Sequence, residues 1–321
     1  MRRSAVLKPG RSCPLSYRYA PEELARGAEL RIDTLWVAGG LYGNPFALER
    51  LLELYEREPG SKALVFNGDF HWFDCRAEEW LAIDKQVQRH LATRGNVETE
   101  LAAPLEGAGC GCAYPAWVDD GTVQRSNRII ERLRGAAQRH PAARESLARL
   151  PMHRVAEVGG ERVAIVHGDA ESLAGWGFSQ EALDTLEGRR SARSAFARSG
   201  VRIFASSHTC LPVLQEFPGE RVVVNNGAAG MPNFRGTRYG VATRISPVRG
   251  NNLYAQRSGA VFVEAVAIDY DAEAWQRRFL AQWPEGSDAH RSYYQRIVSG
   301  PRYSPGQALR QAVPGSASAA A

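Results

Sequence analysis

The chain has 321 residues and a mass of 35.3 kDa, and 44% of its residues are apolar and 23% charged. These proportions are typical of a globular protein with a sizeable core, and they exclude a disordered chain, a collagen-like chain and a coiled coil. No window approaches the roughly 18 uninterrupted apolar residues of a membrane-spanning helix, so we expect no membrane partner. Since the first residues also lack a signal-peptide-like apolar run, the sequence predicts a cytoplasmic protein.

The charge is nearly balanced, with 40 basic and 35 acidic residues and a net charge of +5. The excess is spread along the chain without an aromatic–basic recognition motif, so we do not expect a nucleic-acid partner. The five cysteines are odd in number in a long chain, which favours reduced thiols. A zinc site and a redox pair remain open alternatives, although one-residue spacing is not that of a zinc ribbon. The residues concerned are Cys75, Cys110, Cys112 and Cys210.

Strands and helices alternate in the first half of the chain, after an N-terminal extension over residues 1–30 with a short helical piece at 21–30. Alternating and buried-type apolar runs predict strands at 31–40 and 62–69. Apolar residues at helical spacing predict helices at 45–58, 77–91, 126–140 and 142–151.

Hairpins are more frequent in the second half. The sequence predicts hairpins at 154–169 and 212–230, a helical stretch at 179–200, strands at 201–209, 241–247 and 260–271, and a closing helix at 272–283. We expect one catalytic domain over residues 31–300, followed by a mobile, low-complexity tail over 301–321. Alternation followed by hairpins indicates an α/β protein with a mixed sheet or two packed sheets.

Polar residues of metal-ligand type follow apolar stretches at four places, each beside glycine or serine: Asp69, Asn96, His167 and His208. Open α/β sheets bind ligands at strand ends, so these side chains are candidates for one site. One carboxylate, one amide oxygen and two imidazoles suit Mn, Fe, Zn or Ni. Taken singly, such residues are more often turn residues or hydrogen-bonded structural histidines, and that interpretation stays open.

The order of these motifs resembles the calcineurin-like metallophosphoesterase superfamily. Its members carry, in order, Asp-x-His, Gly-Asp, Gly-Asn, His-Gly and Gly-His-x-His blocks. The matching stretches here are 40–44, 68–69, 95–98, 167–169 and 207–210, and the match spans residues 32–235. The resemblance implies a four-layer α-β-β-α sandwich of two mixed sheets flanked by helices.

The resemblance also implies two metals that share Asp69, but the ligands private to the first metal are replaced here. Its aspartate is Gly40, its first histidine is Tyr42 and its last histidine is Cys210. The ligands of the second metal are all retained: Asp69, Asn96, His167 and His208. The pattern predicts one divalent metal per chain. Val97 also stands where the protein phosphatase branch of the superfamily has a catalytic histidine.

The function that the resemblance implies is hydrolysis of a small phosphomonoester or phosphodiester by a metal-activated water. With one metal, other groups must stabilise the charge that develops during hydrolysis. The candidates are Tyr42 as a hydrogen-bond donor and His71 as a general acid. Cys210 is a possible additional ligand, and Arg94 and Arg235 are candidates for contacting the substrate phosphate. The alternatives are packing roles for Tyr42 and Cys210, a position at the surface or behind the ligands for His71, and solvated surface positions for the arginines.

Two other functions fit the sequence. Loss of the first metal's ligands fits a catalytically weak or inactive protein that binds a phosphorylated ligand or a protein partner. Different chemistry at one metal, such as redox chemistry or hydrolysis of a non-phosphate substrate, is permitted by the cysteines.

Overall fold

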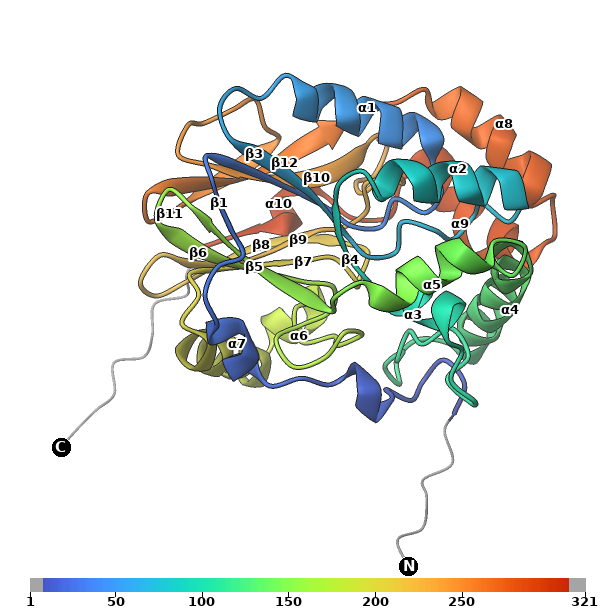
Figure 1. Ribbon diagram of the computed structural model, residues 1–321, viewed down its shortest axis with the longest axis horizontal. Helices are drawn as coiled ribbons and strands as arrows, with labels where there is room; N and C mark the ends of the chain where they lie inside the picture. Colours follow the sequence, from blue (N-terminus) through green and yellow to red (C-terminus); the bar gives the residue numbers. More distant parts are fainter. Residues whose placement is uncertain (1–7, 312–321) are drawn as a thin grey trace, which may run out of the picture.

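The computed structural model describes residues 8–311, in which the strands form two mixed sheets that pack face to face (Figure 1). The first sheet contains, in spatial order, β1 (Leu30–Ile32), β5 (His153–Val158), β6 (Glu161–Val166), β7 (Ile203–Ser206), β9 (Arg221–Asn226), β8 (Pro212–Phe217) and β13 (Leu309–Arg310). The second contains β11 (Tyr254–Ser258), β12 (Val261–Ile268), β10 (Gly240–Ser246), β2 (Thr34–Ala38), β3 (Lys62–Asn67) and β4 (Leu91–Thr93).

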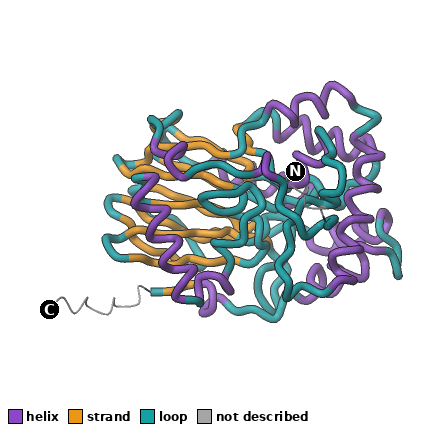
Figure 2. Tube along the Cα trace, turned by 90° about the horizontal axis from the view of Figure 1, so that it is seen from below, coloured by secondary structure: helices purple, strands orange, loops and turns teal. Residues whose placement is uncertain are grey.

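Helices cover the outer faces of both sheets (Figures 1 and 2). The second sheet is covered by α1 (Pro45–Glu56), α2 (Ala77–Val87) and α8 (Ala272–Gln282), and the first by α6 (Gln180–Asp184) and α7 (Leu186–Ser199). One end of the sandwich carries α3 (Asn96–Ala102), α4 (Asp120–Ala137), α5 (Pro141–Arg149) and α9 (Asp288–Ser299). The short elements are η1 (Leu15–Tyr17), η2 (Pro21–Ala25) and α10 (Pro305–Ala308). The predicted four-layer α-β-β-α sandwich is confirmed.

Aliphatic side chains fill the space between the two sheets. Leu35 and Val37 of β2 meet Ile165 of β6 and Val224 of β9 in one buried cluster. Trp36 points to the opposite face of its strand and packs in the cluster that includes the helical layer, because successive strand residues face opposite sides of a sheet. Both faces of the second sheet are therefore buried.

The loop before α1 is fixed by Asn44. Its side-chain oxygen accepts hydrogen bonds from the backbone N–H groups of Phe46 and Ala47, both at 3.1 Å, and Pro45 occupies the first helical turn. Its amide nitrogen donates to the carbonyl of Gly230 at 3.0 Å. One side chain therefore starts the helix and fastens it to the loop between β9 and β10.

Both predicted hairpins are present, as the antiparallel pairs β5–β6 and β8–β9. The helical stretch predicted over 179–200 is two helices, because the Thr185 hydroxyl accepts a hydrogen bond from the N–H of Gly188 and starts α7 there. The apolar stretch before Asn96 forms β4, which ends at Thr93, and Asn96 itself begins α3.

Several segments differ from the sequence expectation. Helices α3 and α9 and strand β11 were not predicted, and the part of the predicted mobile tail up to residue 311 forms α10 and β13, which pairs with β8. Residues 1–7 of the predicted extension and 312–321 of the tail lie outside the described residues. The boundaries of the predicted domain remain a prediction.

A buried ionic network ties β10 to its neighbours. The Arg244 guanidinium lies 2.5 Å from a carboxylate oxygen of Glu58 and 2.5 Å from one of Glu264, whose side chain is fully buried. The other Glu264 oxygen accepts from the N–H of Gly250 and from Asn252, each at 2.8 Å. Each charge in the network therefore depends on its partner.

We expect Arg244→Met to lower the free energy of unfolding by about 3–5 kcal/mol, because the Glu264 carboxylate would be left buried without its cation. Chemical denaturation measures this loss. The control is Arg149→Ala, which removes an exposed pair with Glu145 and should change stability by less than about 1 kcal/mol. Equal effects of the two substitutions would contradict the role of the network.

Candidate metal centre

Four polar side chains converge at one end of the sandwich. The Nε2 atom of His167 lies 3.3 Å from Asp69 Oδ1, 3.3 Å from Asn96 Oδ1 and 3.2 Å from His208 Nδ1. Potential ligand atoms of Asp69, His167 and His208 all lie within 4.8 Å of one another. Asp69 follows β3 and Asn96 follows β4 of the second sheet, whereas the two histidines follow β6 and β7 of the first. The structure therefore brings together all four candidate ligands.

The hydrogen bonds of the two imidazoles fix which nitrogen faces the centre. His167 Nδ1 lies 2.8 Å from the carbonyl of Asn67, and His208 Nε2 lies 3.0 Å from the carbonyl of Cys112. Because a carbonyl only accepts hydrogen bonds, these two nitrogens carry the hydrogens of the neutral rings. The lone pairs of His167 Nε2 and His208 Nδ1 then face one another and Asp69.

The amide of Asn96 is oriented in the same way. Its nitrogen donates to the carbonyl of Cys110 at 2.9 Å, which leaves Oδ1 facing His167. Four lone-pair donors thus surround one point, and each neutral donor is held by a hydrogen bond on its far side. This donor set fits a divalent cation of the Mn, Fe, Zn or Ni type.

The charges of the centre are coupled. Burial and the neighbouring His167 lower the pKa of His208 to about 4, so this ring is neutral at pH 7. Burial also disfavours the charge on His167, but the carboxylate of Asp69 outweighs it and raises the pKa of His167. The two imidazoles in turn hold the pKa of Asp69 below its usual value despite burial. A proton on His167 and a cation in the centre therefore compete for the same lone pair.

Glu98 holds two of the ligand-bearing loops in place. Its fully buried carboxylate accepts the backbone N–H groups of Asp69 at 2.8 Å, Phe70 at 3.1 Å and Gly95 at 2.8 Å. Asp69 itself has a left-handed backbone with φ of 53°, a conformation that needs such support in a residue other than glycine. Glu98 thus joins the turn after β3 to the start of α3.

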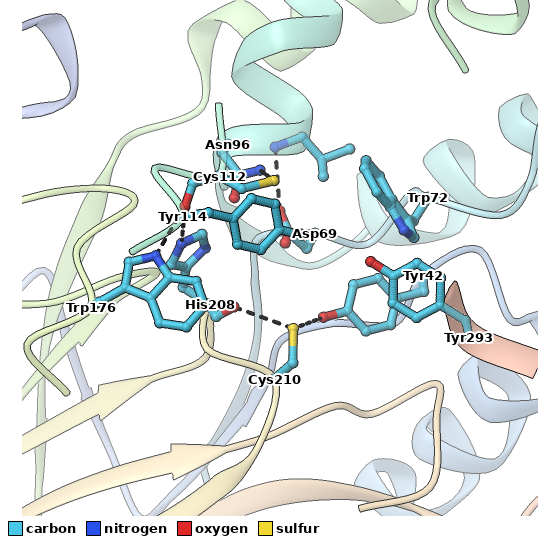
Figure 3. Close-up of a pocket in the computed structure, with 11 residues that line it drawn as sticks. Tyr42, Asp69, Trp72, Asn96, Cys112, Tyr114, Trp176, His208, Cys210 and Tyr293 are labelled. Atoms are coloured by element: carbon cyan, nitrogen blue, oxygen red, sulfur yellow. Dashed lines mark hydrogen bonds between the residues drawn. The ribbon is translucent and has the colours of Figure 1, made fainter. Parts of the chain in front are cut away.

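Tyr42 and Cys210 lie on another side of the same pocket (Figure 3). The Tyr42 hydroxyl is 2.8 Å from Cys210 Sγ, and both residues have left-handed backbones with φ of 56° and 61°. Cys210 is outside the group of possible ligands formed by Asp69, His167 and His208 in the described residues. The full lining comprises Tyr42, Asp69, Trp72, Asn96, Val97, Cys112, Tyr114, Trp176, His208, Cys210 and Tyr293.

Three residues expected near the substrate are not among the residues that line this pocket. His71 is fully buried, stacks on Trp80 with ring centroids 4.4 Å apart, and pairs through Nδ1 with Asp74 at 2.6 Å. Burial alone would lower its pKa, but Asp74 raises it to about 9, so His71 is a buried cation with no face in the pocket. Arg94 donates to a backbone carbonyl on α5, and Arg235 is exposed.

The expectation of reduced thiols is wrong for one pair, because Cys110 and Cys112 form a disulfide, whereas Cys13, Cys75 and Cys210 are free. The proposed four-cysteine zinc site is excluded with it. The carbonyls of the paired residues accept from Asn96 and His208. This cross-linked loop therefore orients two of the four candidate ligands.

Sequence reasoning missed most of the pocket wall. Trp72, Tyr114, Trp176 and Tyr293 line the pocket, yet they are far apart in the sequence and share no spacing. Arg296 of α9 was also missed, and its guanidinium donates to the carbonyls of Cys210 at 2.7 Å and Pro232 at 2.9 Å. Only a three-dimensional arrangement groups these residues.

Two solved structures have the same fold. A metallophosphoesterase from Sphaerobacter thermophilus matches 84% of this chain and 100% of its own with 16% identity and a TM-score of 0.54. A hypothetical protein from Pyrococcus horikoshii matches 85% of this chain and 100% of its own with 15% identity and a TM-score of 0.53. No protein-family model and no curated protein sequence matches the chain. The chain has the metallophosphoesterase fold, which confirms the resemblance at the level of the fold.

Because Gly95 has no side chain, the space in which the candidate ligands meet stays open. A Cβ atom at this position would lie 2.4 Å from Asp69 Oδ1 and 2.8 Å from His167 Nε2. We expect Gly95→Ala to displace these two donors and to weaken binding of Mn²⁺ or Zn²⁺ by about tenfold to a hundredfold, as measured by isothermal titration calorimetry.

The control for that substitution is Gly135→Ala on α4, where an added Cβ has no neighbour within 4 Å. Its metal affinity should equal that of the unaltered protein. An unchanged affinity in a folded Gly95→Ala protein would show that the cation binds somewhere else.

Proposed function

We propose that the protein is a metal-dependent phosphoesterase with one divalent cation held by Asp69, Asn96, His167 and His208. The observation that carries the proposal is the set of far-side hydrogen bonds that turns two imidazole lone pairs and one amide oxygen toward the Asp69 carboxylate. A divalent cation bound there lowers the pKa of a water molecule and polarises a phosphoryl oxygen. The substrate would be a small phosphomonoester or phosphodiester.

The chain supplies neutral hydrogen-bond donors beside this centre. Burial raises the pKa of the Tyr42 phenol well above its usual value, so the hydroxyl keeps its proton at neutral pH. It lies beside Cys210, on the side where the family resemblance puts the private ligands of the first metal. We propose that Tyr42 donates a hydrogen bond to a substrate oxygen and partly replaces the missing cation.

Phosphate binding without turnover is the second candidate function. The Tyr42–Cys210 hydrogen bond supports it, because neutral groups occupy the side where a second cation would stabilise a leaving oxygen. Binding of a phosphorylated ligand by metal-loaded protein that hydrolyses no phosphate ester would identify this function.

Among residues 8–311, no helix is both long and apolar enough to cross a bilayer.

Removal of a ligand should abolish hydrolysis. We expect Asp69→Asn and His208→Ala each to reduce metal-dependent release of p-nitrophenol from phosphate esters by about a hundredfold or more. His90→Ala is the matched control, because this histidine packs between Tyr55 and Phe66 and does not line the pocket. Inert metal-loaded protein across a broad panel of phosphate esters would refute the proposed activity.

Metal stoichiometry tests the single-cation part of the proposal. Elemental analysis should find about one metal per chain, and the triple variant Gly40→Asp/Tyr42→His/Cys210→His should bind about two. The substitutions at residues 40 and 42 must be combined, because a Cβ at residue 40 would lie only 3.0 Å from ring atoms of Tyr42. Two metals in the unaltered protein would overturn the single-cation proposal.

A further inference from the structure

Aromatic side chains surround the candidate metal centre. Five of the pocket-lining residues are aromatic: Tyr42, Trp72, Tyr114, Trp176 and Tyr293. No lysine or arginine of the described chain is among the lining residues. In Figure 3, Trp72, Tyr42 and Tyr293 lie to one side of Asp69, and Trp176 lies with His208 to the other. A substrate would therefore meet rings and neutral donors on entering the pocket.

The rings continue to the surface through Trp117, whose exposed fraction of 61% is large for an indole. Trp117 meets Trp176 edge to face with centroids 6.1 Å apart, and Trp176 meets the ring of His208 at 5.5 Å. The Trp176 indole N–H donates to the carbonyl of Cys112 at 3.0 Å, which fixes its orientation. A series of rings thus connects solvent to the centre.

The cavity is too small to hold both the phosphate and the ester group of a ligand. Its volume is about 40 Å³, which is room for a few water molecules or a phosphoryl group. An aromatic substituent of the ligand would have to lie at the mouth, beside Trp176 and Trp117. Stacking of a planar group on such rings is favourable and tolerates different ring types.

The net charge of the metal-loaded centre favours a phosphodiester over a phosphomonoester. One divalent cation and the Asp69 carboxylate give a net charge of +1, because Asn96, His167 and His208 are neutral when they bind a cation. Arg296 is not among the lining residues, and its guanidinium donates to the carbonyls of Cys210 and Pro232 rather than pointing at the centre. A singly charged phosphodiester neutralises the centre, whereas a phosphomonoester dianion leaves an excess negative charge in a pocket that no lysine or arginine lines.

One buried donor in the wall lacks a well-placed acceptor. Trp72 is 3% exposed and lines the pocket, and its indole Nε1 makes no hydrogen bond of good geometry, its near neighbour being the Tyr293 hydroxyl. Buried N–H groups are almost always paired. An oxygen of a bound phosphodiester is an acceptor that would satisfy this donor without requiring a further charge.

We infer that the site takes a singly charged phosphodiester with a planar aromatic ester group, which packs against Trp117 and Trp176 while its phosphate lies at the metal centre. The inference rests on the proposed function. Hydrolysis of such a substrate breaks one phosphorus–oxygen ester bond. The oxygen of water stays on the phosphomonoester product, and the leaving phenol or alcohol takes up a proton.

The test compares ligands that differ in one property. Calorimetry on the full-length, metal-loaded protein would use diphenyl phosphate as the aromatic monoanion, dibutyl phosphate as the aliphatic monoanion and phenyl phosphate as the aromatic dianion. We expect diphenyl phosphate to bind about tenfold more tightly than either of the others and to quench indole fluorescence. Equal or tighter binding of dibutyl phosphate or phenyl phosphate would overturn the inference.

Trp117 provides the matched variants. Trp117→Ala should weaken binding of diphenyl phosphate by about tenfold and leave dibutyl phosphate unchanged, and Trp117→Phe should restore most of the loss. The control is Leu186→Ala, which removes an exposed apolar side chain on α7. Equal losses for both ligands in Trp117→Ala would show that the indole acts only on the fold of the loop, against the inference.

A nucleoside 5′-(methyl phosphate) distinguishes two sources of the aromatic group. Tighter binding than that of diphenyl phosphate assigns the group to a nucleobase, and weaker binding assigns it to a simple aryl ester. The failure of this inference is separable from that of the proposed function. Protein that hydrolyses monoesters but binds no diester contradicts only the inference, whereas protein without any hydrolytic activity contradicts the function and leaves the binding comparison valid.

Discussion

Two backbone carbonyl groups determine the chemistry of the candidate centre. The carbonyl of Asn67 accepts from His167 and that of Cys112 accepts from His208, so each ring turns its remaining nitrogen toward Asp69. Without these acceptors the rings would be free to rotate or to change tautomer, and the four donors would not share one focus. The surrounding turns serve mainly to bring those carbonyls to the correct side of each ring.

The turns themselves depend on a small number of buried polar contacts. The Glu98 carboxylate gathers three N–H groups from two loops, and Asn44 fastens the start of α1 to the loop after β9. Such contacts give a rigid site only when every buried group has a partner. Trp72 is a pocket residue that departs from this pattern, which is why we regard its N–H as available to a ligand.

The layers and the candidate ligands were predictable from the sequence, because both follow from local patterns. Alternating apolar residues mark the strands, and Asp69, His167 and His208 follow such runs within two residues or so. The burial of His71 was not predictable, since its partners Asp74 and Trp80 enclose it only after the turn and α2 pack together. The aromatic wall and the Cys110–Cys112 disulfide likewise depend on loops whose paths no periodicity encodes.

The candidate ligands are divided between the two sheets, with Asp69 and Asn96 following strands of one and His167 and His208 following strands of the other. An ion bound by all four would therefore cross-link the two sheets of the sandwich. Moving one sheet relative to the other would require breaking bonds between the ion and its ligands. Loading with metal would then raise the melting temperature of the whole molecule, because the ion binds the folded chain and not the separated layers.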